Sequence, residues 1–116
     1  MRFAIGDVMV EMIDDLPAMD FQLAMLMPGV DPRWLAPYLD WLEPAHFTVA
    51  TATLHLACHA FVLRHAGRVV LVDTCVGCHK PRPIRPAWDR RTDDGFLHRL
   101  AAAGIAPSHP ARYRSR

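Results

Sequence analysis

The sequence predicts a mixed α/β (α+β) fold in which a strand hairpin and two helical segments share one core. Residues 61–65 and 68–73 have the pattern of two strands joined by a tight turn at Ala66-Gly67. Helical patterns begin at Asp31-Pro32 and at Thr92. The chain is 52% hydrophobic and only 22% charged, which is the composition of a polypeptide that builds a core.

The first thirty residues carry weaker signals. Residues 3–13 mix apolar and polar positions around Gly6-Asp7, which predicts one or two short strands with a turn or bulge. Residues 16–30 are rich in methionine and end at Pro28-Gly29. Because methionine commonly fills irregular gaps, we expect a loosely packed loop or short helix there.

Both predicted helices have recognisable start signals. Asp31 is an acidic cap followed by proline, and apolar residues then recur on one face, although Pro37 predicts a break or kink. Thr92 is the expected cap of the second helix, and Gly104 is its expected end. The apolar face of this second helix is formed by Phe96, Leu97, Leu100 and Ala103.

The remaining segments differ sharply in polarity. Residues 69–72 form a continuous apolar run, which predicts a strand covered on both faces inside a layered structure. Residues 80–91 hold three prolines and five basic residues and are expected to form an irregular loop. Residues 108–116 contain no acid and almost no apolar residue, so we expect a disordered basic tail.

Charge is distributed unevenly along the chain. Residues 1–50 carry eight acidic and two basic residues, whereas residues 51–116 carry four acidic and eleven basic ones. The basic residues follow no helical stripe and few aromatics lie among them, so nucleic acid is not an expected partner. No run of eighteen apolar residues exists, and early acids interrupt any export signal, so we expect a cytoplasmic protein that does not bind a membrane.

One stretch resembles a known family. Residues 59–77, His-Ala-Phe-Val-Leu-Arg-His-Ala-Gly-Arg-Val-Val-Leu-Val-Asp-Thr-Cys-Val-Gly, followed by residues 78–83, are similar to the hairpin and glycine turn near the start of metallo-β-lactamase-fold hydrolases, in the lactonase-like branch. The segment from Phe96 to Pro107 matches more loosely. The resemblance implies that residues 1–107 form a partial domain, the N-terminal half of an αββα sandwich.

What the family implies about chemistry is a metal-activated water. Its members hold one or two metal ions, usually zinc, and hydrolyse an ester, lactone or related bond. The resemblance places the main ligands in a His-x-His-x-Asp-His motif after the next strand, where this chain has Ser108 to Arg116. We therefore expect a truncated hydrolase-like chain, through a genuine truncation or a frameshift, with no metal ligand, catalytic residue or cofactor of its own and no activity alone.

The same resemblance assigns supporting positions near that metal site. It implies that Asp73, at the end of a strand, supports the site by hydrogen bonding without being a primary ligand. It further implies that Thr74 and Gly77 shape the turn that follows. Cys75 stands where many members of the family have glycine.

The pattern Cys75-Val76-Gly77-Cys78-His79 admits other chemistry. It matches the haem attachment motif, it offers zinc ligands that Cys58, His55 or His59 would have to complete, and it matches a thioredoxin-type redox pair. Two unrelated cysteines at a turn is the simplest interpretation, because the prolines after Cys78 prevent the helix that a redox pair normally opens. His55 and His59 would lie about 13 Å apart in a strand, too far for one ion.

Two further functions stay open at this stage. The chain is also compatible with a small non-enzymatic module whose exposed sheet edge pairs with another chain. It is equally compatible with one piece of a split hydrolase. The corresponding partners are a second copy of the chain, through self-association, or a separately supplied C-terminal half.

Overall fold

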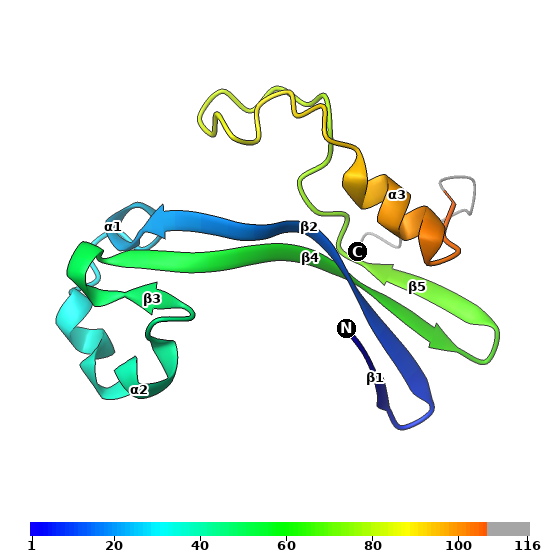
Figure 1. The fold of residues 1–116 in the computed structure, drawn as a ribbon, viewed down its shortest axis with the longest axis horizontal. Coiled ribbons are helices and arrows are strands. Elements are labelled where there is room, and N and C mark those ends of the chain that lie inside the picture. Colours follow the sequence, from blue (N-terminus) through cyan, green and yellow to red (C-terminus); the bar gives the residue numbers. More distant parts are fainter. Residues whose placement is uncertain (107–116) are drawn as a thin grey trace. The chain divides into compact units, whose positions relative to one another are not determined.

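The computed structural model describes residues 1–106 and is a mixed α/β structure, as the sequence predicts (Figure 1). The predicted tail, residues 108–116, lies outside the described residues. The elements in chain order are β1 (Arg2–Ile5), β2 (Val8–Gln22), α1 (Leu23–Leu26), η1 (Pro32–Tyr38), α2 (Leu39–Leu42), β3 (Phe47–Thr48), η2 (Val49–Thr51), β4 (Thr53–His65), β5 (Arg68–Val72) and α3 (Gly95–Ala102).

The strands form one five-stranded sheet. Its order is β1-β2-β4-β3, and β5 pairs with β4 as well. The pairs β1–β2, β3–β4 and β4–β5 are antiparallel. Within the described residues β5 pairs only with β4, so its other side is an edge of the sheet.

The described chain divides into two compact units. One comprises residues 1–15 and the chain from His59 onward, and the other comprises Leu16–Cys58. The first unit contains the hairpin β4–β5, the basic loop and α3, whereas the second contains the short helices and β3.

Strand β2 is longer than the sequence predicts. The expectation of a loop or helix over residues 16–30 is wrong for residues 16–22, which continue the strand, and is met by the short helix α1 only at Leu23–Leu26. Phe21 is buried in this extension. Local patterning missed it because β2 lies between two other strands, and pairing in a sheet overrides weak local preferences.

The predicted hairpin is confirmed. Strands β4 and β5 pair with Phe61 opposite Val72 and His65 opposite Arg68, leaving a two-residue turn. Ala66 and Gly67 both have positive φ, +46° and +73°. These values are those of the turn that matches the twist of paired strands, in which both central residues are left-handed.

Ala66 is the strained member of this turn. An alanine in the left-handed region is less stable than asparagine or glycine there. Ala66→Asn is therefore expected to raise the unfolding free energy by about 0.5–1 kcal/mol. Urea unfolding would measure the gain, and a loss of stability would contradict the turn geometry.

The environment predicted for β5 is wrong for the described residues. A run covered on both faces was expected, but Val69, Val70 and Val72 are 50%, 53% and 44% exposed. Only Leu71 of this strand packs against the core below α3. Val70 and Val72 are exposed because they point to the face of β5 opposite Leu71 and α3, whereas Val69 is exposed although it shares the side of Leu71.

In the second unit, the start of the predicted helix is confirmed but its packing is not. Asp31 caps the segment by accepting a hydrogen bond of 2.9 Å from the backbone N–H of Arg33. The helix is 3₁₀ up to Tyr38 and α-helical only at Leu39–Leu42, in agreement with the break expected at Pro37. The predicted apolar face is not buried, since Trp34 and Tyr38 are 65% and 52% exposed.

Helix α3 supplies the core of the first unit. Phe96 and Leu100 are buried against the sheet, in a cluster with Ile13, Ala60 and Val62. Leu97, also predicted on the buried face, is 48% exposed because it lies at the margin of that face, next to the hollow between α3 and the sheet. Gly104 has a φ of +77° just after the last turn, which confirms it as the end of the helix.

The helix does not begin at the predicted cap. Asp94 occupies the cap position in place of Thr92, and its side chain makes no capping bond. Asp93 instead provides the acceptor for a free backbone N–H at the start of the helix, because its carboxylate accepts a 2.9 Å hydrogen bond from the N–H of Gly95. This bond is the main reason why the pKa of Asp93 is lowered, with burial opposing it and the charges of Arg91 and Arg99 adding to it.

Because the pKa of the Asp93 carboxyl is lowered on folding, its contribution to stability must decrease in acid. The contribution of Asp93 to the helix start is present above the ordinary aspartate pKa and is lost as pH falls through the lower folded value. Asp93→Ala should therefore speed hydrogen exchange at the Gly95 amide near neutral pH, and this difference from the wild type should shrink in acid. Exchange measured by NMR tests this, with Asp94→Ala as the control expected to leave the Gly95 amide unchanged.

Candidate functional site

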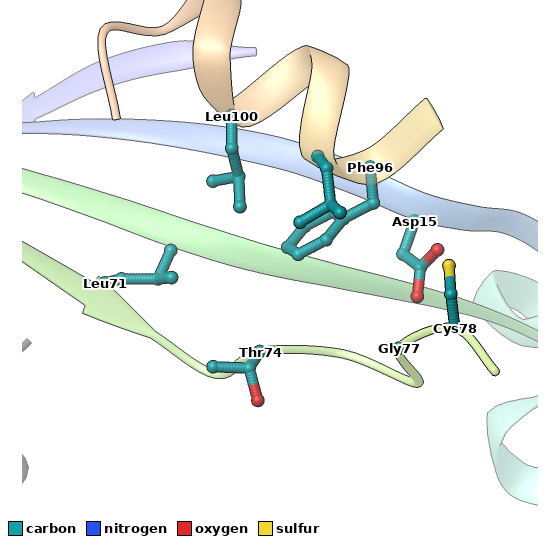
Figure 2. Close-up of a pocket in the computed structure, with 8 residues that line it drawn as sticks. Asp15, Leu71, Thr74, Gly77, Cys78, Phe96 and Leu100 are labelled. Carbon is teal, nitrogen blue, oxygen red and sulfur yellow. The ribbon is translucent and has the colours of Figure 1, made fainter. Parts of the chain in front are cut away.

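A small hollow of about 160 Å³ lies between the sheet and α3 (Figure 2). Apolar side chains dominate its wall, with one carboxylate and one thiol among them. The lining residues are Asp15, Leu71, Thr74, Gly77, Cys78, Phe96, Leu97 and Leu100. Figure 2 shows Asp15 and Cys78 at one end of the hollow and Leu71 and Leu100 at the other.

Asp15 is the buried polar group of this site. It follows Ile13 on the helix-covered face of β2, since alternate residues of a strand share one face. One carboxylate oxygen accepts a 3.0 Å hydrogen bond from the N–H of Val76, and the other accepts 2.9 Å from the Arg91 guanidinium. The two side chains are only 1% and 8% exposed, so this is a buried ion pair.

Surrounding groups reinforce this ion pair. Burial lowers the pKa of Arg91, but the hydrogen bond and charge of Asp15, with the charge of Asp93, more than offset it and leave the pKa raised. Arg99 of α3 donates to the backbone carbonyl of Asp14 at 2.7 Å. These contacts tie the basic loop and α3 to β2.

The three residues that the resemblance singles out lie in the turn after β5. Thr74 and Gly77 line the hollow, whereas Asp73 does not. The carboxylate of Asp73 accepts a 2.7 Å hydrogen bond from the N–H of Cys75, and so it braces its own turn. Asp73, Cys75 and Gly77 all have positive φ, of 70°, 57° and 74°, which makes this turn strongly irregular.

The cysteines form no disulfide with one another. The thiol of Cys78 donates to the backbone carbonyl of Asp93 at 2.8 Å, and Cys75 packs against the core cluster. No helix follows Cys78 before α3, which agrees with the expected break after the motif. His55 lies in β4, as expected, and in the second unit it contacts Asp20 and the Thr48 hydroxyl, each at 2.7 Å.

The donors of this hollow do not fit a zinc ion. Zinc takes histidine nitrogen, thiolate sulfur or carboxylate oxygen, with at least three protein ligands. The lining offers one carboxylate and one thiol and no histidine, which is fewer than three ligands. What the arrangement can do chemically is hold a small apolar group beside a neutralised carboxylate.

Sequence reasoning missed the Asp15–Arg91 pair. A signal for half of it was present, because Asp15 continues the inward-facing positions of β2 after Ile13. The predicted strand ended at residue 13, however, which hid that alternation. Nothing local in the sequence distinguishes Arg91 from the other basic residues of its loop.

Comparison with protein-family models, with curated proteins and with solved structures finds no match for this chain. Within residues 1–106, no helix is long and apolar enough to cross a membrane. The structure thus defines a small α/β protein with an antiparallel sheet and one well-packed helix.

Proposed function

We propose that residues 1–107 are the scaffold half of a metal-dependent hydrolase of the metallo-β-lactamase type, and that this chain alone neither holds the metal nor hydrolyses a substrate. In such a sandwich each sheet is covered by helices on one face and by the other sheet on its second face. The proposal therefore requires a sheet with one helix-covered face and one bare apolar face.

The observation that carries the proposal is this second face. Leu71, Ala60 and Val62 face α3, so their neighbours along β5 and β4 face the opposite way. His59 and Phe61 follow this alternation, with ring centroids 5.0 Å apart. We define the open face as the apolar residues on this side of the first unit that are not fully buried, which are Phe3, Ile5, Val8, Phe61, Leu63, Val70 and Val72; Val10 lies on the same side but is only 4% exposed.

The open face is what a second sheet would cover. Ile5 and Val70 on its two outer strands are 65% and 53% exposed. Contiguous exposed apolar surface of this kind marks an interaction site in a soluble protein. Two sheets pack about 10 Å apart through such faces, so the face is suited to the partner sheet of a sandwich.

Activity is not expected from this chain because it lacks the metal-ligand motif on which the family's chemistry depends. The sequence contains no His-x-His-x-Asp-His motif, and Asp73, the carried-over supporting residue, bonds to its own turn. Metal analysis of the purified chain should find no stoichiometric zinc, and ester and lactone substrates should not turn over. Tight zinc at one ion per chain with turnover would overturn the proposal.

The open face can be tested by association. Without a second sheet it should drive self-association, and Val70→Lys should weaken that association at least about tenfold because it buries a charge in the contact. Leu97→Lys is the matched control, since Leu97 is 48% exposed but lies on α3. Sedimentation velocity measures both. A monomer at every concentration, or equal loss in both variants, would contradict the role of this face.

A second candidate function is favoured by the edge of β5. This strand pairs only with β4 among the described residues, and its valines are exposed. Such an edge can add a strand from another chain through backbone hydrogen bonds. A non-enzymatic partner module would then bind another chain at the edge of β5, whereas a split hydrolase would bind its other half at the open face. Val69→Pro should weaken binding at the edge, and Val70→Lys should weaken binding at the open face, so the two variants distinguish the two functions.

A further inference from the structure

The loop between β5 and α3 is held together by its own hydrogen bonds. We define the basic loop as residues 79–91, which is the segment drawn in yellow tones before α3 in Figure 1. The N–H of His79 donates to the carbonyl of Arg91, and that of Arg90 to the carbonyl of Lys80, both at 2.8 Å. The loop is thus closed at its base.

Internal hydrogen bonds order the rest of this loop. The N–H of Trp88 donates to the carbonyl of Arg85 at 2.8 Å. The carboxylate of Asp89 accepts 2.6 Å from the backbone N–H of Arg82. Asp89 is the loop's one acid, and this bond to the backbone commits one of its oxygens to the loop's own architecture. A loop ordered before binding loses little entropy when a ligand arrives.

Arg82 carries a buried donor that the protein leaves unused. One terminal nitrogen of its guanidinium donates to the carbonyl of Val76 at 3.2 Å, but its Nε is buried and has no hydrogen-bond partner. Among the described residues Arg82 has no carboxylate in an ion pair. A buried N–H of a charged group without an acceptor is costly, so an acceptor brought to this nitrogen would remove that cost.

The surroundings of Arg82 form a second hollow of about 330 Å³. It is lined by Arg82, Pro83, Ile84, Arg85 and Trp88. The Arg85 guanidinium lies 5.7 Å from the centre of the Trp88 ring. Ile84 is 91% exposed, so its apolar side chain is accessible to a ligand. The hollow therefore combines two guanidinium groups with an apolar and aromatic wall.

We propose that the basic loop binds a small organic anion, whose carboxylate or phosphate is held by Arg82 and Arg85 and whose apolar or aromatic body lies against Trp88 and Ile84. A guanidinium recognises either anion through paired hydrogen bonds. Lys80 and Arg90 add positive potential around the hollow. This site is separate from the hollow at Asp15 and does not depend on the proposed hydrolase scaffold.

Titration of the intact chain with phenyl phosphate, benzoate and inorganic phosphate tests the proposal by NMR. The Arg82 Nε–H and Trp88 indole N–H resonances report the two parts of the hollow. Phenyl phosphate or benzoate should shift both resonances with saturation. Inorganic phosphate should bind at least about tenfold more weakly, because it lacks the body that the aromatic wall holds.

Variants separate a built site from general attraction to a basic surface. Arg85→Gln and Arg82→Lys should each weaken binding of the preferred anion by at least about tenfold. Arg90→Gln removes the same charge from the same loop outside the hollow, and it should change affinity by less than about threefold. Arg85→Gln keeps the test valid if Arg82→Lys disturbs the loop through its bond to Val76.

Three outcomes would overturn the proposal. One is the absence of any saturable shift up to about 10 mM anion. Another is a loss in Arg90→Gln as large as that in Arg85→Gln, which would indicate unspecific attraction. The third is binding of a short single-stranded oligonucleotide far more tightly than either aromatic anion, which would make the loop a nucleic-acid contact instead.

Discussion

Replacing Asp15 with alanine is expected to lower the unfolding free energy by about 3–5 kcal/mol. The substitution leaves the Arg91 guanidinium, 8% exposed, without its counter-charge. It also removes the acceptor of the Val76 N–H. Both losses fall in the same buried position, so this should be among the most damaging single changes in the first unit. Urea unfolding followed by circular dichroism measures it.

The matched control is a surface ion pair of the same sheet. Arg2 and Glu11 are 2.8 Å apart, with side chains 63% and 18% exposed. Glu11→Gln should cost less than about 1 kcal/mol, because water and salt screen an exposed pair. Replacing both Asp15 and Arg91 with apolar residues should recover part of the loss. Equal costs for Asp15→Ala and Glu11→Gln would contradict the burial of the pair.

The second large effect is expected at Phe96. This side chain is 6% exposed and packs with Leu100 against the sheet residues Ile13, Ala60 and Val62. Phe96→Ala removes an aromatic ring from the main described core of the first unit and leaves a cavity, which costs about 3–5 kcal/mol. The same unfolding experiment reports the change.

Leu97 provides the comparison for Phe96. It is the next residue of the same helix and is 48% exposed. Leu97→Ala should cost less than about 1 kcal/mol, because little of its side chain leaves water on folding. A cost for Leu97→Ala as large as that for Phe96→Ala would mean that α3 packs through a different face.

Elements with strong local signals were predictable from the sequence. The Ala66-Gly67 turn, the Asp31 cap and the Gly104 stop each depend on the conformation of one or two residues, and all three are found in the structure. The extension of β2 through residues 16–22 was not predicted, because it depends on pairing with a strand distant in sequence. The cap of α3 was misplaced because three capping candidates follow one another, Thr92, Asp93 and Asp94.

The sites were less predictable than the elements. Thr74 and Gly77 were singled out by resemblance, and they do line the hollow at Asp15. Asp15 and Arg91 were not singled out, because an ion pair between residues distant in sequence leaves no local pattern. The basic loop was predicted to be irregular, which is correct. Its internal hydrogen bonds and the unused Arg82 donor follow from three-dimensional placement alone.

The Asp15–Arg91 ion pair joins residues 76 positions apart in the chain. On the ribosome, β2 and β4 will therefore be synthesised well before the partner that neutralises Asp15 leaves the exit tunnel. Until then the nascent chain presents an unpaired acid beside exposed apolar strands, which is the kind of segment that chaperones bind. Folding of this unit is thus expected to be completed only once Arg91 and α3 have left the tunnel.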